Sequence, residues 1–201
     1  MASEMFMRAT LAERCRTCKR SGSVNGAQRG PTMPITMFSF VGLYDRTLAS
    51  LAHLLDKGAA FASEQGLDPD AILDWRLVED MHPLRFQAEV VVSFSRQWTA
   101  RAAGLPVPER LSDSASLADL RAAITAAQGD LATLTPEQFA GRDDEPMTVP
   151  ITDTMEPTLP TGQWLSVFAT TNIYFHLSMA YAILRMKGVP IGKIDLFAGR
   201  L

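Results

Sequence analysis

Four long segments of the chain carry apolar residues at alternating steps of three and four, and this spacing constrains the fold more than any other feature. It places the apolar side chains on one face of an α-helix. We expect helices over residues 41–64, from residues 80–83 to about 103, over residues 117–134 and over residues 162–187. No parallel-sheet pattern accompanies them. Four amphipathic helices of this length predict an all-α fold, a four-helix bundle.

The residues between these segments support the expected boundaries. Ser116 and Asp119 form a capping-box pattern at the start of the third helix, and Gly188 follows the fourth where a helix normally ends. Residues 68–75 begin with Asp-Pro and predict a short helical piece. Residues 141–161 are polar and contain four prolines, so we expect a long irregular connection before the last helix, with one short strand at residues 147–151.

The first 37 residues differ from the rest of the chain. They are rich in arginine, glycine and serine and lack an apolar period, so we expect disorder there and a folded domain over residues 38–201. Three interpretations stay open: a dispensable tail or an upstream start codon, with Met33 or Met37 as the functional start; an organelle-targeting peptide; or a metal site at Cys15 and Cys18. The metal interpretation has two ligands, whereas zinc needs four.

Composition narrows the class of protein. Hydrophobic residues make up 47% of the chain, enough to build a core, and residues 38–201 contain no cysteine. The formal net charge of −3 argues against a nucleic-acid partner. We find neither a signal-peptide core nor an uninterrupted apolar run long enough for a membrane span, so we expect a cytoplasmic protein without a membrane partner, with organelle targeting as the alternative.

The familiar catalytic and nucleotide-binding motifs are absent from the sequence, so we assign no catalytic residue and weigh the three histidines one by one. His53 falls on the same side of its helix as Arg46 and Lys57, which predicts a surface position. His82 precedes Pro83 in the expected first turn of the second helix, where it either caps and packs or has a functional role.

His176 is expected in a different environment. It falls on the apolar stripe predicted for the last helix, one turn after Asn172, with Leu165, Phe168, Met179 and Ile183 on the same face. Two inward polar side chains at this spacing need hydrogen-bond partners. They form either a satisfied pair within the core or the floor of a ligand pocket between helices.

A further pattern is formed by Asn172 to Arg185, Gly188 to Asp195, Leu43 to Asp45, Leu54 to Lys57, Arg76–Leu77, Asp80–Met81, Pro83–Leu84 and Gln87. Together these residues resemble a bacterial and fungal domain-of-unknown-function family within the DinB/YfiT-like superfamily of proposed metalloenzymes. The resemblance spans about residues 38–199 and is weak over residues 105–162. It implies a DinB-like four-helix bundle that is usually a homodimer.

The resemblance also implies a metal centre, which this sequence matches incompletely. Relatives bind a divalent metal through three histidines, two of them spaced HxxxH on the last helix. Here those positions hold Asn172 and His176, and Gln87 and His82 lie near the expected third position. Amides are poor ligands for zinc or nickel. We therefore predict no cofactor, with His176 as a weak candidate ligand for zinc or nickel, and a ligand pocket formed by these four residues.

Three functions follow as hypotheses. The first is a small-molecule-binding or stress-associated protein with a degenerate metal site. The second, implied by the resemblance, is a metal- and thiol-dependent transferase or isomerase. The third is a dimeric scaffold without ligand, for which Tyr174 and Tyr181 are expected on the outer face of the last helix, as at subunit contacts. An open polar pocket at His176 would favour the first two.

Overall fold

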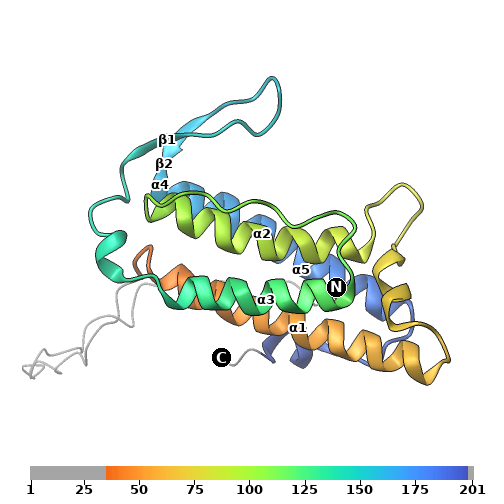
Figure 1. The fold of residues 1–201 in the computed structure, drawn as a ribbon. Coiled ribbons are helices and arrows are strands. Elements are labelled where there is room, and N and C mark those ends of the chain that lie inside the picture. Colours follow the sequence, from red (N-terminus) through yellow and green to blue (C-terminus); the bar gives the residue numbers. More distant parts are fainter. Residues whose placement is uncertain (1–34, 199–201) are drawn as a thin grey trace, which may run out of the picture. The chain divides into compact units, whose positions relative to one another are not determined.

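The computed structural model describes residues 35–198, and the predicted all-α architecture is confirmed (Figure 1). Four long helical stretches dominate this part of the chain: α1 (Ser39–Glu64), α2 (Leu84–Ala102), α3 (Leu117–Ala132) and a continuous stretch that ends in α5 (Thr170–Met186). The last stretch begins with α4 (Thr161–Gln163) and passes through a π-helical turn, η3 (Trp164–Ala169). Predictions for Cys15, Cys18 and Met33 lie outside the described residues.

Short elements connect these helices. Three 3₁₀ helices are η1 (Pro69–Asp74), η2 (Pro136–Gln138) and η4 (Lys193–Phe197). The connection before α4 contains an antiparallel hairpin of β1 (Pro146–Thr148) and β2 (Thr158–Pro160), which extends away from the helices in Figure 1. The single strand expected at residues 147–151 is therefore one arm of a hairpin. This arm, β1, begins one residue earlier than expected, at Pro146, and ends at Thr148.

The helix ends follow local chemistry. The capping box predicted for α3 is present, since the Asp119 amide donates to the Ser116 hydroxyl oxygen and the Ser116 amide donates to the Asp119 carboxylate. The second helix begins at Leu84, later than expected, because Pro83 has extended backbone and occupies the N-cap. Met37, which the sequence analysis placed in the tail, is buried against the core.

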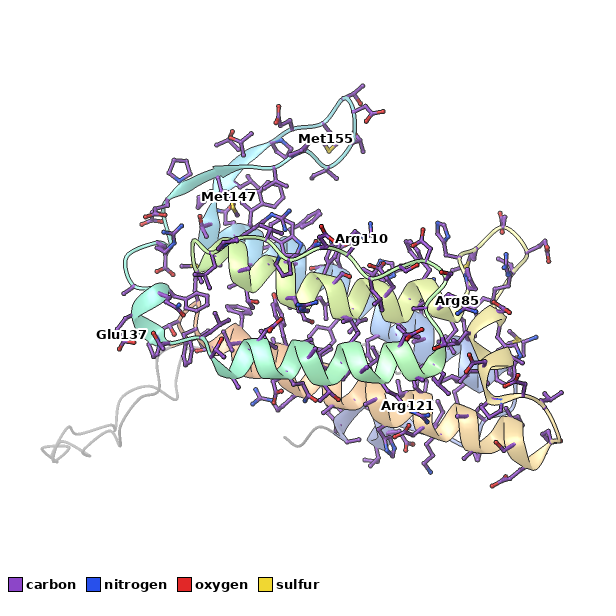
Figure 2. All side chains as sticks on the ribbon, viewed as in Figure 1. Arg85, Arg110, Arg121, Glu137, Met147 and Met155 are labelled. Atoms are coloured by element: carbon purple, nitrogen blue, oxygen red, sulfur yellow. The ribbon has the colours of Figure 1, made fainter. Side chains whose placement is uncertain are left out.

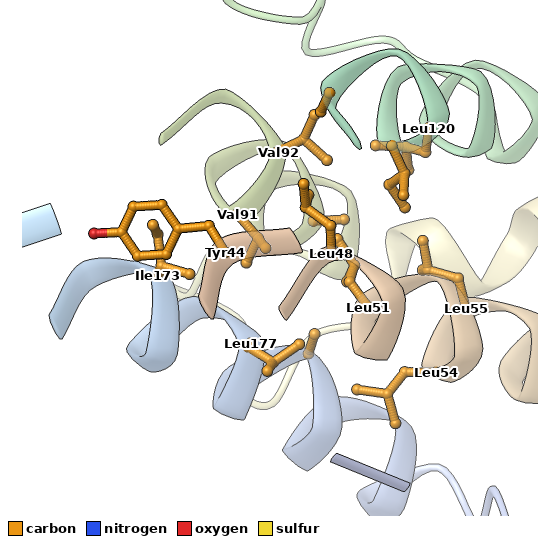
Figure 3. Close-up of a cluster of buried hydrophobic side chains, with 14 of the residues drawn as sticks. Tyr44, Leu48, Leu51, Leu54, Leu55, Val91, Val92, Leu120, Ile173 and Leu177 are labelled. Carbon is orange, nitrogen blue, oxygen red and sulfur yellow. The ribbon is translucent and has the colours of Figure 1, made fainter. Parts of the chain in front are cut away.

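The core forms where the apolar stripes of the long helices meet (Figure 3). The predicted stripe of α1 is buried along its whole length, from Tyr44 to Ala62. Leucines of α1 point toward α2, α3 and α5 in Figure 3, where they meet Val91, Leu120 and Leu177. Each fully buried leucine contributes roughly 2 kcal/mol by removal from water. This burial fixes which faces of α2 and α5 point inward.

An irregular segment covers the remaining face of α2. We call residues 104–116 the strap, and four side chains of α2 at four-residue spacing hold it by hydrogen bonds. Arg85 donates to the carbonyl of Ala115, and Gln97 donates to the carbonyl of Pro108. Between them, Glu89 and Ser93 bind Arg110 and the Leu111 amide. Figure 2 labels Arg85 and Arg110 along this side of α2.

The π-helical turn η3 changes which residues of the last helix face inward. A π turn holds more residues than an α turn, so the helix face rotates across it. The buried positions of α5 are therefore Ile173, Leu177, Ala180, Ile183 and Leu184. The predicted inward positions of Asn172 and His176 are therefore met only in part, because both side chains are half-buried at the edge of the core.

Tyr44 completes the hydrogen bonding of this turn. The Leu165 carbonyl accepts from the Tyr44 hydroxyl and from the Thr170 hydroxyl, each at 2.9 Å. A π turn leaves carbonyl groups without their α-helical partners, and buried carbonyls need replacements. Burial raises the pKa of Tyr44 far above its usual value, and the Thr170 hydroxyl lowers it to a smaller extent. The phenol therefore stays protonated and can donate.

One helical stretch within residues 35–198, Thr161–Met186, is long and apolar enough to cross a membrane by length and composition. Asn172 and His176 interrupt its apolar sequence, so no membrane span was predicted there. Helices in the core of a globular domain meet the same criterion, and this stretch contributes Ile173, Leu177 and Leu184 to the core. Its hydropathy is therefore weak support for a membrane span.

Candidate functional site

A chain of hydrogen bonds links the middle of α5 to the start of α2. His176 Nδ1 lies 2.7 Å from the Oε1 atom of Gln87, and Gln87 Nε2 donates to the backbone carbonyl of His82 at 3.0 Å. Gln87 is almost fully buried, whereas His176 is half-buried and the His82 side chain is exposed. The structure thus brings together three of the four predicted site residues, although His82 takes part through its backbone.

Asn172 does not join this group. Its side-chain Nδ2 donates to the Phe168 carbonyl, one turn earlier on the same helix, at 2.8 Å. An asparagine amide that binds its own helix in this way is satisfied locally and is not directed at a partner helix. The predicted pairing of Asn172 with His176 is therefore not observed.

Aromatic rings surround the His176 imidazole. The rings of Phe86 and Phe175 contact it edge-to-face, at centroid distances of 5.8 and 5.1 Å. The His82 ring stacks on Phe86 at 4.0 Å, which is a packing role. Phe175 is 53% exposed, so the aromatic group is open to solvent on that side.

The electrostatic environment favours a neutral His176. Burial lowers the pKa of His176 below its usual value of 6.5, because desolvation disfavours the charged ring. The Glu89 carboxylate raises it to a smaller extent, and His82 and Arg110 lower it further. At neutral pH the imidazole is therefore uncharged, with one nitrogen as a donor and the other as an acceptor.

An ion pair that was not predicted from the sequence lies close to this group. The Glu89 side chain is buried and accepts two hydrogen bonds from the half-exposed Arg110 guanidinium and one, at 2.6 Å, from the Ser93 hydroxyl. Glu89 raises the pKa of Arg110. A glutamate inside an otherwise apolar run of α2, Ala88 to Val92, was the available signal, because a buried carboxylate needs a cationic partner.

His53 has a partner that its helix position did not indicate. Its side chain is 35% exposed, in line with the predicted surface position, but its Nε2 lies 2.7 Å from a carboxylate oxygen of Asp195 in η4. The two residues border a hollow of about 440 Å³ that Ile194, Phe197 and Ala198 also line. Ser50, one turn before His53, donates to the Leu196 carbonyl, so no serine–histidine pair forms here.

The residues present do not fit a metal centre of the kind that the resemblance implies. No group of three histidine, cysteine, aspartate or glutamate side chains within residues 35–198 could hold a metal ion. Around His176, the amide of Gln87 is committed to hydrogen bonds and the amide of Asn172 binds its own helix. Zinc and nickel favour imidazole over amide ligands. One imidazole with two committed amides is a poor donor set.

The tyrosines proposed for a subunit contact differ from each other. Tyr174 is 42% exposed, whereas Tyr181 is partly buried against the core, so only Tyr174 lies on the outer face of α5 as predicted. Tyr174 has the exposed Phe175 as its neighbour, and Val167 is exposed two turns earlier. These three side chains are exposed apolar residues of the last helical stretch.

Comparisons with known proteins agree with the all-α fold. A family model described as "Domain of unknown function (DUF1993)" matches residues 38–197. The crystal structure of a DinB family member protein from Shewanella denitrificans aligns with a TM-score of 0.66 at 30% sequence identity, over 79% of this chain and 94% of that chain. Comparison with curated proteins gave no match. The resemblance identified from the sequence is thereby confirmed.

Proposed function

This chain belongs to the DUF1993 family, and from that premise we propose that it is a DinB-like helical protein that binds a small molecule at His176 in place of a metal. The observation that carries the proposal is the bond between His176 Nδ1 and Gln87 Oε1. It engages one imidazole nitrogen and leaves Nε2 without a partner among the described residues, and the exposed ring of Phe175 contacts the same imidazole ring.

The composition of the site supports binding over a purely structural role. A histidine that only fills a core satisfies both ring nitrogens within the protein. Here no buried side-chain polar atom of the described residues lacks a partner, and Nε2 makes no hydrogen bond to them, so Nε2 reaches solvent. An accessible acceptor with apolar rings around it is the arrangement of a ligand site.

The metal- and thiol-dependent alternative has less support. Its ligand set would need Asn172 and Gln87 to give up their hydrogen bonds and bind through amide oxygens. We derive no reaction step through a metal at this site.

A dimeric scaffold is the second candidate, favoured by the exposed apolar side chains of Val167, Tyr174 and Phe175 in the last helical stretch. In that case the side chain of Phe175 is buried by a second copy, and the access to His176 is closed. The scaffold and the binding site therefore compete for the same aromatic residue.

The test is a screen of neutral fragments against protein with ¹³C-labelled histidines, read by the ring resonances in NMR. We expect bound fragments to shift the His176 resonance in a saturable way and to leave His53 and His82 within error. The variant His176→Ala should lose the binding, and the matched variant His53→Ala should keep it.

Two outcomes contradict the proposal. Near-stoichiometric zinc or nickel in the purified protein, lost on His176→Ala, restores the metalloenzyme alternative. A dimer by light scattering with no fragment binding, converted to a monomer with binding by Phe175→Asp, supports the scaffold.

A further inference from the structure

We infer that Gln87 is a positioning residue that keeps the His176 proton on Nδ1, and that the ligand of this site is a neutral aromatic hydroxyl compound whose hydroxyl donates to Nε2. This inference rests on the proposed function, because it names the class of ligand for the same site. Two hydrogen bonds carry it, one from Gln87 to the His82 carbonyl and one between His176 and Gln87.

The backbone determines the orientation of the Gln87 amide. A backbone carbonyl can only accept, so the group that lies 3.0 Å from the His82 carbonyl must be the Gln87 nitrogen. The Gln87 oxygen then faces His176 at 2.7 Å, and an amide oxygen can only accept. The proton between them belongs to His176 Nδ1. In the neutral imidazole, Nε2 is consequently an unprotonated acceptor.

The charges near His176 exclude an ionic ligand. Three groups act on the imidazole: His82 from the loop before α2, Glu89 from α2 and Arg110 from the strap. Glu89 and Arg110 compensate each other in a two-bond ion pair. A carboxylate ligand has no proton to give to Nε2, and a cation finds no free anionic partner among these three. A neutral donor is the class that matches an accessible acceptor.

The surrounding rings specify the rest of the ligand. Phe86 and Phe175 present their edges or faces around the imidazole, at 70° and 88° to it. An aromatic ring adds offset-stacked or edge-to-face contacts with them, and Phe175 is exposed enough to receive one. An aromatic hydroxyl compound supplies both a neutral hydrogen-bond donor for Nε2 and a ring that packs against Phe86 and Phe175. Phenol is the simplest probe of this class.

The first measurement needs no variant. In full-length protein with ¹⁵N-labelled histidine, we expect His176 Nδ1 to show the shift of a protonated imidazole nitrogen and Nε2 that of an unprotonated one. Phenol should move the Nε2 signal in a saturable titration. Anisole has the same ring with a methyl ether in place of the hydroxyl, and it should bind at least roughly fivefold more weakly, the equivalent of one neutral hydrogen bond.

The second measurement separates positioning from folding. Gln87→Met keeps the length of the side chain without the acceptor, so the His176 proton should distribute between both nitrogens and phenol should bind roughly fivefold more weakly. Gln87→Glu restores an acceptor and should restore the Nδ1–H tautomer. A residue with a packing role alone would not change the ¹⁵N pattern.

Acid provides a third measurement. Protonation converts Nε2 from an acceptor into a donor, so phenol binding should be constant above the usual pKa of 6.5 and fall as the pH decreases through the lowered pKa of His176. The hydrogen bond to Glu89 raises the pKa of Arg110, so the guanidinium stays charged throughout this range and should not contribute to the change.

Each failure has its own pattern. If the proton of His176 lies on Nε2 in the wild type, or if anisole binds as well as phenol at His176, this inference is overturned and the proposed function survives. If neither probe nor any fragment shifts the His176 resonance, the proposed function fails as well.

Discussion

Arg110 in the strap donates from two nitrogens to the carboxylate of Glu89 in α2, and only the arginine side of this pair is exposed to solvent. The pair holds an irregular segment, which has no helical or sheet hydrogen bonds of its own, against the central helix. The contribution of this ion pair to the free energy of unfolding therefore depends mainly on the buried Glu89 carboxylate.

Removal of Arg110 should destabilise the domain. Arg110→Ala leaves the Glu89 charge buried with the Ser93 hydroxyl as its remaining partner, and we expect a loss of about 2–4 kcal/mol in the free energy of unfolding, measured by urea denaturation. Arg121→Ala is the control, because Arg121 and Asp56 form an ion pair whose side chains are both about half-exposed. That variant should lose less than about 1 kcal/mol. Equal losses would show that Glu89 is not buried in solution.

Loss of the Tyr44 hydroxyl should weaken the π turn. Tyr44→Phe removes one of the two donors to the Leu165 carbonyl, which should cost about 1–2 kcal/mol in the free energy of unfolding. Tyr174→Phe is the matched control at an exposed position and should change it by less than about 0.5 kcal/mol. Protection of the turn amides against hydrogen exchange should fall in the first variant alone. If Tyr44→Phe left the free energy of unfolding unchanged, a water molecule would have replaced the hydroxyl as the donor to the Leu165 carbonyl.

The contact between η4 and α1 should loosen in acid. The Gly192 amide and then His53 lower the pKa of Asp195 below its usual value of 3.8. A carboxyl group with a lowered pKa stabilises the folded state above its unfolded pKa, and this contribution disappears as the pH falls through the folded value. The hydrogen-exchange protection factor of the Gly192 amide should therefore decrease below pH 3.8. In Asp195→Asn the protection factor should no longer depend on pH in this range.

A buried leucine of α3 should be more sensitive than an exposed one. Leu120 is fully buried, and Leu120→Ala should cost about 2–5 kcal/mol because it leaves a cavity between α1 and α3. Leu67→Ala makes the same chemical change at a residue that is 48% exposed, and should cost less than about 1 kcal/mol. Chemical denaturation of both variants checks the assignment of the α3 face. Similar costs would contradict it.

A second histidine should create a metal site in this scaffold. Asn172→His places two imidazoles one turn apart on the same half-buried face of α5, and zinc affinity should rise at least roughly tenfold over the wild type. The gain should be largest above pH 7, where imidazoles are neutral. Ser178→His adds a histidine two residues from His176, on a different face, and should leave the affinity unchanged in the same calorimetric titration.

The helices were predictable because the spacing of apolar residues alone indicates which side chains lie on the buried face of a helix and which lie on the exposed face. In α2, the apolar residues that recur at steps of three and four from Leu84 to Ala102 are buried, as the period predicts, and the capping box of Ser116 and Asp119 gave the start of α3. The strap was not predictable, because it has no period. Its partners Arg85, Glu89, Ser93 and Gln97 resemble an ordinary solvated face until the path of the strap is known.

For the candidate site, the identity of the residues was predicted better from the sequence than the orientation of their side chains. His176 and Gln87 do meet, as the resemblance implied, but the orientation of Asn172 was predicted only in part, because an α-helical period was extended through the π turn. The partner of His53 was not predicted because Asp195 lies 142 residues away in an irregular segment. Contacts of this kind depend on tertiary packing, which local patterns do not encode.

The π turn has a consequence for the alignment of relatives with this chain. A single-residue deletion within Trp164–Ala169 would convert the wide turn into an ordinary α-helical one, and the buried faces on both sides would stay in place. Homologues can therefore differ by one residue in the distance from Trp164 to His176 and still present the same side chain to Gln87. An alignment that places the gap within α5, after the π turn, would pair His176 with a residue from another face of the relative's helix. A histidine that the relative has at the equivalent position would then be overlooked.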